Sequence, residues 1–246
     1  MPGKRWRLLL AAAAALLWAS PAHAMHISEG ILPAPWAAGW FLVAAVFVGW
    51  GLREVRRRSA SRPVFKPMIG LVGAAVFLIS CMPVPVPWVG TCSHPCGTGL
   101  AAVLIGPGPT IVVASVALLF QALFLAHGGL TTLGGNIFSM GVVGALSGYG
   151  AFLLVRRTTG SALWGAFFAG LIGDWCTYAA TSLEMGLALH GDAPFPSLFV
   201  SLLLAFAPTQ IPLGMAEGLV SMAAYRFIRT RRPEMLALAL EKGGEA

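Results

Sequence analysis

Long apolar runs, separated by short glycine- and proline-rich or arginine-rich segments, dominate the hydrophobic pattern of this chain. A helix needs about 20 apolar residues to cross a bilayer, and several runs approach or reach that length. The pattern predicts helices near residues 36–52, 67–82, 100–105, 110–126, 134–155, 161–189 and 196–225. The predicted fold class is therefore all-α: a polytopic membrane helix bundle of about seven transmembrane helices in one domain.

Composition supports this class, since 57% of the residues are hydrophobic and only 10% are charged. The net charge of +7 does not indicate nucleic-acid binding, because the basic residues gather in a few places. Beyond residue 24 they lie within 53–66, 156–157 and 226–242. Under the positive-inside rule these segments are cytoplasmic, which puts the proline-rich segment 83–96 on the outer side.

The segment 99–126 has to begin and end on the outer side if the other helices alternate in direction. It is shorter than two full spans of about 20 residues each. A short helix at 100–105, a turn at 106–109 and a helix at 110–126 satisfy both constraints. Such a broken element is tolerated at membrane depth only where it is buried in protein or lines a cavity.

Residues 1–24 have the pattern of a secretory signal peptide. A basic start is followed by an apolar run at 8–17 and by Ala-His-Ala at 22–24. The apolar run is too short to span a bilayer as a helix, which favours removal of the signal before Met25. Two alternatives stay open: an uncleaved signal anchor, and Met25 as the true first residue.

A chain that begins at Met25 carries a metal chelator at its own terminus. The free amine, the amide nitrogen between Met25 and His26, and the imidazole Nδ1 of His26 can all face one ion. Three nitrogens in a plane suit a divalent late transition metal such as Ni(II) or Cu(II), and not Mg²⁺ or Ca²⁺. His94, in the irregular loop 90–99 on the same side, is the predicted fourth ligand. The alternative for this loop is a turn with a solvated histidine.

Polar residues within or beside apolar helices are functional candidates, because they are costly in hydrocarbon. Hydrogen bonds to metal-binding imidazoles fix the tautomer and the angle of the rings. The candidates for this second layer around the metal are Ser93, Gln121, His127 and Asn136. The alternative is that they only join helices to one another, and helix pairing or docking to partner subunits is the role expected of Asp174 and Glu217.

Five long motifs lie between residues 25 and 229. They read MHISEG at 25–30, CSHPCGTG at 92–99, LFQALFLAHGGLTTLG at 119–134, GDWCTY at 173–178 and TQIPLGMAEG at 209–218. On these motifs the chain resembles the cobalt- and nickel-specific substrate-binding membrane subunit, or S component, of energy-coupling factor transporters. The resemblance implies a seven-helix fold in which Met25, His26 and His94 supply the metal ligands.

The resemblance also implies an ATP-driven importer of divalent cobalt that supplies cobalamin biosynthesis, with nickel as the alternative cargo. The transported ion is the only metal, and no cofactor is expected. The implied partners are a transmembrane coupling subunit, two cytoplasmic ATPase subunits, a small accessory membrane protein in some assemblies, and membrane lipid, with no nucleic acid.

The division of the chain follows from these expectations. Residues 1–24 are the signal peptide, 25–232 form the transmembrane substrate-binding domain, and 233–246 form a short cytoplasmic tail. The expected location is the bacterial inner membrane, crossed several times. The mature N-terminus and the loop with His94 then lie on the periplasmic side.

Two features depart from the family pattern. Many relatives begin directly at the Met-His terminus, so here the site depends on cleavage before Met25 or on a start at that residue. The family loop usually has threonine where this chain has Cys96. Cys92 and Cys96 could form a disulfide or add thiolate ligands, although a free buried cysteine that packs as a small apolar residue is the commoner case.

The sequence has neither a GxxxxGK[ST] loop nor an H-E-x-x-H pair. The chain is therefore predicted to be a transporter subunit and not an enzyme, with ATP hydrolysed by partner chains, and an intramembrane hydrolase is disfavoured. More distant alternatives are a membrane metal sensor and a passive metal channel. A channel would pass ions through vesicles without nucleotide.

Overall fold

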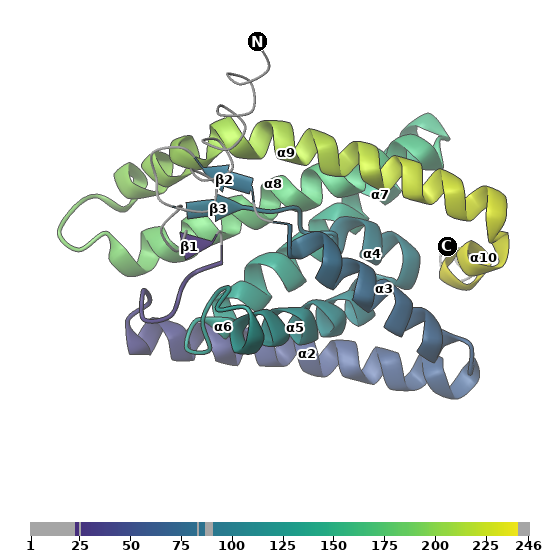
Figure 1. Ribbon diagram of the computed structural model, residues 1–246, viewed down its shortest axis with the longest axis horizontal. Helices are drawn as coiled ribbons and strands as arrows, with labels where there is room; N and C mark the ends of the chain where they lie inside the picture. Colours follow the sequence, from purple (N-terminus) through teal and green to yellow (C-terminus); the bar gives the residue numbers. More distant parts are fainter. Residues whose placement is uncertain (1–22, 25, 83, 87–90, 241–246) are drawn as a thin grey trace, which may run out of the picture.

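Helices form the body of the molecule, a computed structural model that describes residues 23–24, 26–82, 84–86 and 91–240 (Figure 1). The helices are α2 (Ala34–Ser61), α3 (Phe65–Ser80), α4 (Thr98–Ile105), α5 (Pro107–Phe124), α6 (Leu133–Asn136), the π-helix η1 (Ile137–Val143), α7 (Gly144–Thr159), α8 (Ala162–Leu189), α9 (Phe195–Arg231) and α10 (Pro233–Leu240). Every segment that the apolar pattern predicted to be helical contains a helix.

Four helical stretches of the described chain are long and apolar enough to cross a membrane. They are Ala34–Ser61, Pro107–Phe124, Leu133–Thr159 and Phe195–Arg231, and Phe65–Ser80 is a shorter apolar helix. The prediction of a polytopic membrane helix bundle is confirmed at this level. The count of seven membrane spans stays a prediction.

Several helices differ from their predicted bounds. α2 continues for a further turn or more beyond the predicted end at residue 52, because the arginines that follow are good helix formers and the helix extends into them. α9 reaches Arg231 and keeps Pro208 and Pro212 inside one helix. The helix predicted at 134–155 is in fact α6, η1 and α7 in succession, with a π-helical segment where a regular α-helix was expected.

The short helix α4 is buried along its whole length, as the sequence required of a broken element at membrane depth. Small residues let it approach its neighbours closely. A Cβ atom added to Gly148 of α7 would lie 2.8 Å from the Cα of Gly99 in α4 and 2.7 Å from the carbonyl oxygen of Ala169 in α8. The three backbones thus meet where no side chain larger than hydrogen fits at Gly148.

The structure adds a three-stranded sheet to the all-α prediction. β3 (Thr91–Ser93) lies between β1 (His23–Ala24), which pairs with it in parallel, and β2 (Val84–Val86), which pairs with it in antiparallel. Strands this short have no hydrophobic periodicity to reveal them. The sheet places the chain just before His26 beside the strand just before His94.

α10 forms the beginning of the segment predicted to be a cytoplasmic tail. Its Leu236 is buried in the main hydrophobic cluster, together with Leu104 of α4 and Tyr225 of α9. The first part of the tail therefore packs on the bundle. Residues 241–246, and with them the end of the predicted tail, lie outside the described residues, as do residues 1–22 of the predicted signal peptide.

The C-terminal ends of α2, α7 and α9, which carry most of the basic residues, lie at one end of the molecule, and β1, β3 and α6 lie at the other (Figure 1). At the basic end Arg58 donates to the carbonyl oxygen of Ile105 at 2.7 Å and pairs with Glu54 at 2.8 Å. Its guanidinium also lies 5.3 Å from the ring centre of Phe65. One side chain therefore joins α2 to the end of α4 and the start of α3.

Candidate metal centre

Three histidines from three separate segments converge at the end of the bundle opposite the arginines. His26 follows β1, His94 follows β3, and His127 lies in the loop after α5. The ring centres are 4.5 Å apart for His26 and His94, 4.9 Å for His26 and His127, and 5.0 Å for His94 and His127. One nitrogen of each lies within 4.8 Å of the others, so the three imidazoles can face one ion.

The two histidines predicted as ligands present their nitrogens directly to each other. His26 Nδ1 and His94 Nε2 are 2.7 Å apart. Two nitrogens at right angles on one metal, each about 2.0 Å from it, would be about 2.8 Å apart. The observed spacing therefore fits neighbouring positions of a square-planar or octahedral ion.

The backbone selects the tautomer of His94. Its Nδ1 lies 3.0 Å from the carbonyl oxygen of Pro95. Because a carbonyl oxygen only accepts, Nδ1 carries the proton, and a neutral imidazole then has a lone pair on Nε2. This is the nitrogen that faces His26, as a metal ligand requires.

Burial keeps the cluster uncharged. Burial lowers the pKa of His26 well below the usual 6.5, and the nearby His94 and His127 lower it further. Burial, followed by the effect of His127, lowers the pKa of His94 to about 3. The pKa of the more exposed His127 is lowered by burial as well. All three rings are therefore neutral at ordinary pH, the state in which imidazole binds a metal.

Asn136 and the glycine turn before α6 hold the segment that follows His26. The Asn136 side chain accepts from the amide of Ile27 at 2.8 Å and donates to the carbonyl of Ile27 at 3.1 Å. Gly128 adopts φ +80°, and a Cβ there would lie 3.1 Å from the Cβ of His26 and 3.2 Å from the Asn136 amide. Asn136 thus holds the backbone of Ile27 and not the imidazole of His26. Gly128 leaves room for the side chains of His26 and Asn136.

Contacts from α9 hold the loop with His94. The Ser93 hydroxyl lies 3.2 Å from that of Thr209 and accepts a short hydrogen bond from the side-chain amide of Gln210. Glu217 accepts from the backbone amides of Cys96 and Gly97 at 2.7 and 2.8 Å. His94 is therefore fixed on both sides by a helix more than a hundred residues away in the sequence.

The structure separates the predicted site residues into two groups. His26, His94, His127, Ser93 and Asn136 gather at the centre. Gln121 instead donates to the Ser80 hydroxyl at 2.7 Å and contacts Cys81, so it joins α5 to α3 as the alternative proposed. Met25 lies outside the described residues.

Sequence reasoning did not identify Thr209, Gln210 or Thr132 as supports of the site. Thr132 donates to the carbonyl of Ile27 at 2.5 Å. These residues lie inside the recognised motifs 119–134 and 209–218, which was the signal available for them. Glu184, in α8, is also fully buried, and both of its carboxyl oxygens are unpaired among the described residues.

A second cluster of possible ligands lies in the same region and consists of Cys96, Asp174 and Glu217. Cys96 is a free, buried cysteine, and its thiol donates to Asp174 Oδ1 at 3.7 Å. The thiol therefore makes a polar contact instead of only filling space. The structure gives no support to the disulfide alternative, and the side chain of Cys92 is not described.

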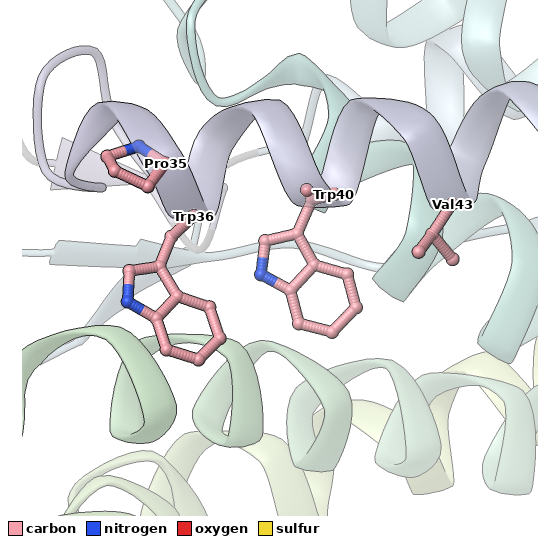
Figure 2. Close-up of a pocket in the computed structure, with 5 residues that line it drawn as sticks. Pro35, Trp36, Trp40 and Val43 are labelled. Atoms are coloured by element: carbon pink, nitrogen blue, oxygen red, sulfur yellow. The ribbon is translucent and has the colours of Figure 1, made fainter.

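A shallow groove of about 400 Å³ runs along the first turns of α2. Figure 2 shows Trp36, Trp40 and Val43 projecting from the same side of this helix, with Pro35 at its start. Its lining residues offer no imidazole, thiol or carboxylate. This groove is therefore unsuited to a metal ion.

Comparison with known proteins gives a family for this geometry. The family described as "Cobalt uptake substrate-specific transmembrane region" (CbiM) matches residues 26–235. The chain belongs to this family. The match begins at His26 and includes every residue of the centre described above.

Curated relatives agree with the CbiM assignment. The chain is 53% identical over 223 residues to the "Cobalt transport protein CbiM" of Geobacter sulfurreducens, across 91% of this chain and 64% of that protein. It is 56% identical over 213 residues to the protein of the same name from Sorangium cellulosum, across 86% of this chain and 94% of that one. The chain thus spans less than two thirds of the first relative and nearly all of the second.

Two solved structures have the same fold. One, described as "Crystal Structure of an Truncated Transition metal Transporter", superposes with a TM-score of 0.74 at 23% identity and covers 83% of this chain and 98% of that one. The other, described as "Crystal Structure of an transition metal transporter", gives a TM-score of 0.73. At this identity the likeness establishes the arrangement of the helices alone.

Proposed function

We propose that this chain is the substrate-binding membrane subunit of an ATP-driven energy-coupling factor importer for divalent cobalt. The observation that carries the proposal is the pair of imidazole nitrogens of His26 and His94, 2.7 Å apart and neutral, in a chain of the cobalt uptake family. The names of the relatives favour cobalt as the cargo. Nickel is the alternative, because the same nitrogen ligands suit both ions.

The proposed ligands are the amine of Met25, the amide nitrogen and Nδ1 of His26, and Nε2 of His94. The pairing of β1 with β3 supports this arrangement, because it brings the residue before Met25 next to the loop that carries His94. Ala24 is in register with Cys92, and His26 contacts His94, so both covalent neighbours of Met25 lie against the 91–94 segment. Cleavage after Ala24, or a start at Met25, would create a free amine one residue before His26.

The proposed binding step follows from the state of the histidines. The Co²⁺ ion arrives from the periplasmic side, loses water and takes the place of the hydrogen bond between His26 and His94. His127 is the least buried of the three, so it lines the entrance and offers a third nitrogen during entry. Burial keeps all three rings neutral, so the imidazoles release no net proton, but the proton that His26 Nδ1 shares with His94 Nε2 has to move to His26 Nε2 before Nδ1 binds the ion. The Met25 amine and the His26 amide each release a proton to the solvent as they bind.

The proposed partners supply the energy that this chain cannot. A transmembrane coupling subunit and two cytoplasmic ATPases would drive reorientation and release of the ion to the cytoplasm, with a small accessory membrane protein completing some assemblies. The chain would lie in the bacterial inner membrane with the arginine-rich ends of α2, α7 and α9 inside. Delivery of cobalt to cobalamin biosynthesis is the proposed purpose of the uptake.

Intact mass and metal titration test the central proposal. The purified chain should begin at Met25 and bind Co²⁺ tightly, and both His26→Ala and His94→Ala should abolish tight binding. His190→Ala is the matched control, because His190 lies outside the histidine cluster and contacts the carbonyl of Ala193 and the ring of Phe195. Retention of residues 1–24 together with binding that survives either substitution would overturn the proposed chelate.

Uptake into vesicles separates this proposal from the sensor and the channel. With the coupling subunit and the ATPases present, Co²⁺ should accumulate only when ATP is supplied. Entry without nucleotide would indicate a passive channel, and binding without entry under any condition would indicate a sensor.

A further inference from the structure

Cys96, Asp174 and Glu217 form a buried cluster beneath the loop that carries His94. They come from three elements: the loop before α4, the middle of α8 and the C-terminal half of α9. Their exposed fractions are 0, 0 and 4%. One possible ligand atom of each, a sulfur and two carboxylate oxygens, lies within 4.8 Å of the others.

The contacts inside the cluster leave ligand positions free. Glu217 accepts one backbone hydrogen bond on each oxygen, from Cys96 and from Gly97, and each carboxylate oxygen has a second lone pair. The Cys96 thiol contacts Asp174 Oδ1 at 3.7 Å. Asp174 Oδ2 has no hydrogen-bond partner among the described residues, although the side chain is fully buried.

The cluster has two acidic groups and no ion-pair partner in the described part of the chain. The ion pairs found there join Arg58 to Glu54 and Arg232 to Glu234, both at the basic ends of the helices. Two carboxyl groups buried side by side avoid the cost of an isolated charge by keeping protons or by coordinating a metal ion. The unpaired Asp174 oxygen, beside a second carboxyl group and a thiol, is a ligand position that a cation can take in exchange for those protons.

We propose that Cys96, Asp174 and Glu217 form a second, inner binding site for a divalent transition metal ion. A set of one sulfur and two oxygens suits a borderline ion such as Co²⁺ and disfavours Mg²⁺ and Ca²⁺, which prefer oxygen alone. On binding, the ion displaces two protons to the solvent, one from the Cys96 thiol and one from the carboxyl pair. One thiolate and one carboxylate then match its charge, and the other carboxyl group binds through its carbonyl oxygen.

The position of the site gives it a place in transport, and this part of the inference rests on the proposed function. His94 and Cys96 are two residues apart on one loop, so the outer and inner sites share a wall. An ion that leaves the histidines has the inner cluster within reach of the same loop. The inner site would therefore receive the ion between the outer face and the release to the cytoplasm.

Cobalt spectroscopy tests the inner site without the outer one. The full chain with His26→Ala and His94→Ala is titrated with Co²⁺ alone. A thiolate-to-cobalt absorption band should develop in the near ultraviolet as one ion binds. Adding Cys96→Ser should remove the band and weaken binding by about tenfold or more, whereas adding Cys176→Ser, the matched control on α8 outside the cluster, should change neither.

Asp174→Asn provides a second variant that keeps the shape of the side chain. It should weaken Co²⁺ binding while leaving gel filtration and the unfolding temperature unchanged. If the double histidine variant does not fold, the unmodified chain is titrated beyond the first equivalent, where the same band should appear with the second ion.

The outcomes separate the inner site from the proposed function. Binding to the folded chain without a thiolate band, or a band that survives Cys96→Ser, overturns the inner site. If tight binding that depends on His26 and His94 persists in that case, the proposed function stands. If the unmodified chain shows the thiolate band but binds no ion through His26 and His94, the inner site is supported and the outer site is overturned.

Discussion

The carbonyl oxygen of Pro95 determines which nitrogen of His94 is free for an ion. Proline is the residue directly after the histidine, and its carbonyl accepts from Nδ1 within the same turn. A histidine in a flexible loop would exchange tautomers freely. Here a local contact directs Nε2 toward His26 before any metal arrives.

We expect Asn136→Ala to weaken Co²⁺ binding by about tenfold to a hundredfold, the usual effect of losing a support of a metal ligand. The side chain holds both backbone groups of Ile27, so its loss frees the segment next to His26. Isothermal titration of the purified chain measures the affinity.

Gln121→Ala is the control for Asn136→Ala. It also removes a buried side-chain amide, but one that contacts Ser80 and Cys81 away from the histidines. Its affinity for Co²⁺ should equal that of the unmodified chain. Equal weakening in the two variants would mean that Asn136 acts through general stability and not through His26.

Acidification should destabilise the metal-free chain. Imidazoles of the unfolded chain take up protons near pH 6.5. In the folded chain His94 stays neutral until about pH 3, and the pKa of His26 is also lowered. The unfolded state therefore binds more protons below about pH 6.5, and stability falls as the pH falls. The unfolding temperature in detergent at about pH 7 and about pH 5 measures the effect.

His94→Gln should show a smaller loss of stability on acidification, because one of the depressed imidazoles is gone. An equal loss in His94→Gln would show that the buried histidines do not cause the pH dependence.

The sequence predicted the centre through its most unusual residues. His26 and His94 stood out because histidine beside a new terminus and histidine in a glycine- and proline-rich loop both have a chemical interpretation. Gln121 and Asn136 were indistinguishable in sequence, as both are amides near helix ends. Only the packing of α5 on α3 shows that Gln121 serves the bundle while Asn136 serves the site.

At the scale of elements, close contact between backbones fixes the position of α4. We expect Gly148→Ala to destabilise the chain by about 1–3 kcal/mol, the usual cost of overpacking. The added Cβ would lie 2.7 Å from the carbonyl oxygen of Ala169, and backbone cannot move as a flexible side chain can. Thermal unfolding in detergent measures the change.

Gly150→Ala, in the same helix, is the control for Gly148→Ala. A Cβ at Gly150 has nothing within 4 Å, so alanine fits and favours the helix. Its stability should equal or exceed that of the unmodified chain. A similar loss in both variants would assign the effect to the backbone of α7 and not to its contact with α4 and α8.

Helices were predictable because apolar runs and the breaks between them carry a strong signal. Even the short α4 was predictable, because the segment 99–126 had to begin and end on the same side of the membrane. The sheet of β1, β2 and β3 was not predictable, since strands of two or three residues leave no pattern. The π-helical η1 was also missed, because a change in helical hydrogen bonding at 137–143 leaves the apolar character of the run intact.

At the scale of the whole molecule, charge and metal centre occupy opposite ends (Figure 1). The arginines at the ends of α2, α7 and α9 predict that this end faces the cytoplasm. On the proposed function, the histidine centre then lies at the end of the molecule nearer the side from which imported ions come.

Cysteine labelling of cells tests this orientation. A membrane-impermeant thiol reagent should label Asp192→Cys, in the loop between α8 and α9, in intact spheroplasts. It should label Thr159→Cys, at the end of α7, only after the membrane is opened. Labelling of the native cysteines is subtracted with the unmodified chain, and the opposite pattern would reverse the assigned topology.

The anchoring of the His94 loop on α9 has a consequence for biosynthesis. Ser93 and Cys96 are held by Thr209, Gln210 and Glu217, which the ribosome adds more than a hundred residues later. A nascent chain that already contains both histidines still lacks the residues that fix one of them. On the proposed function, the full affinity for cobalt would be acquired only near the end of translation, and unfinished chains would not sequester the ion.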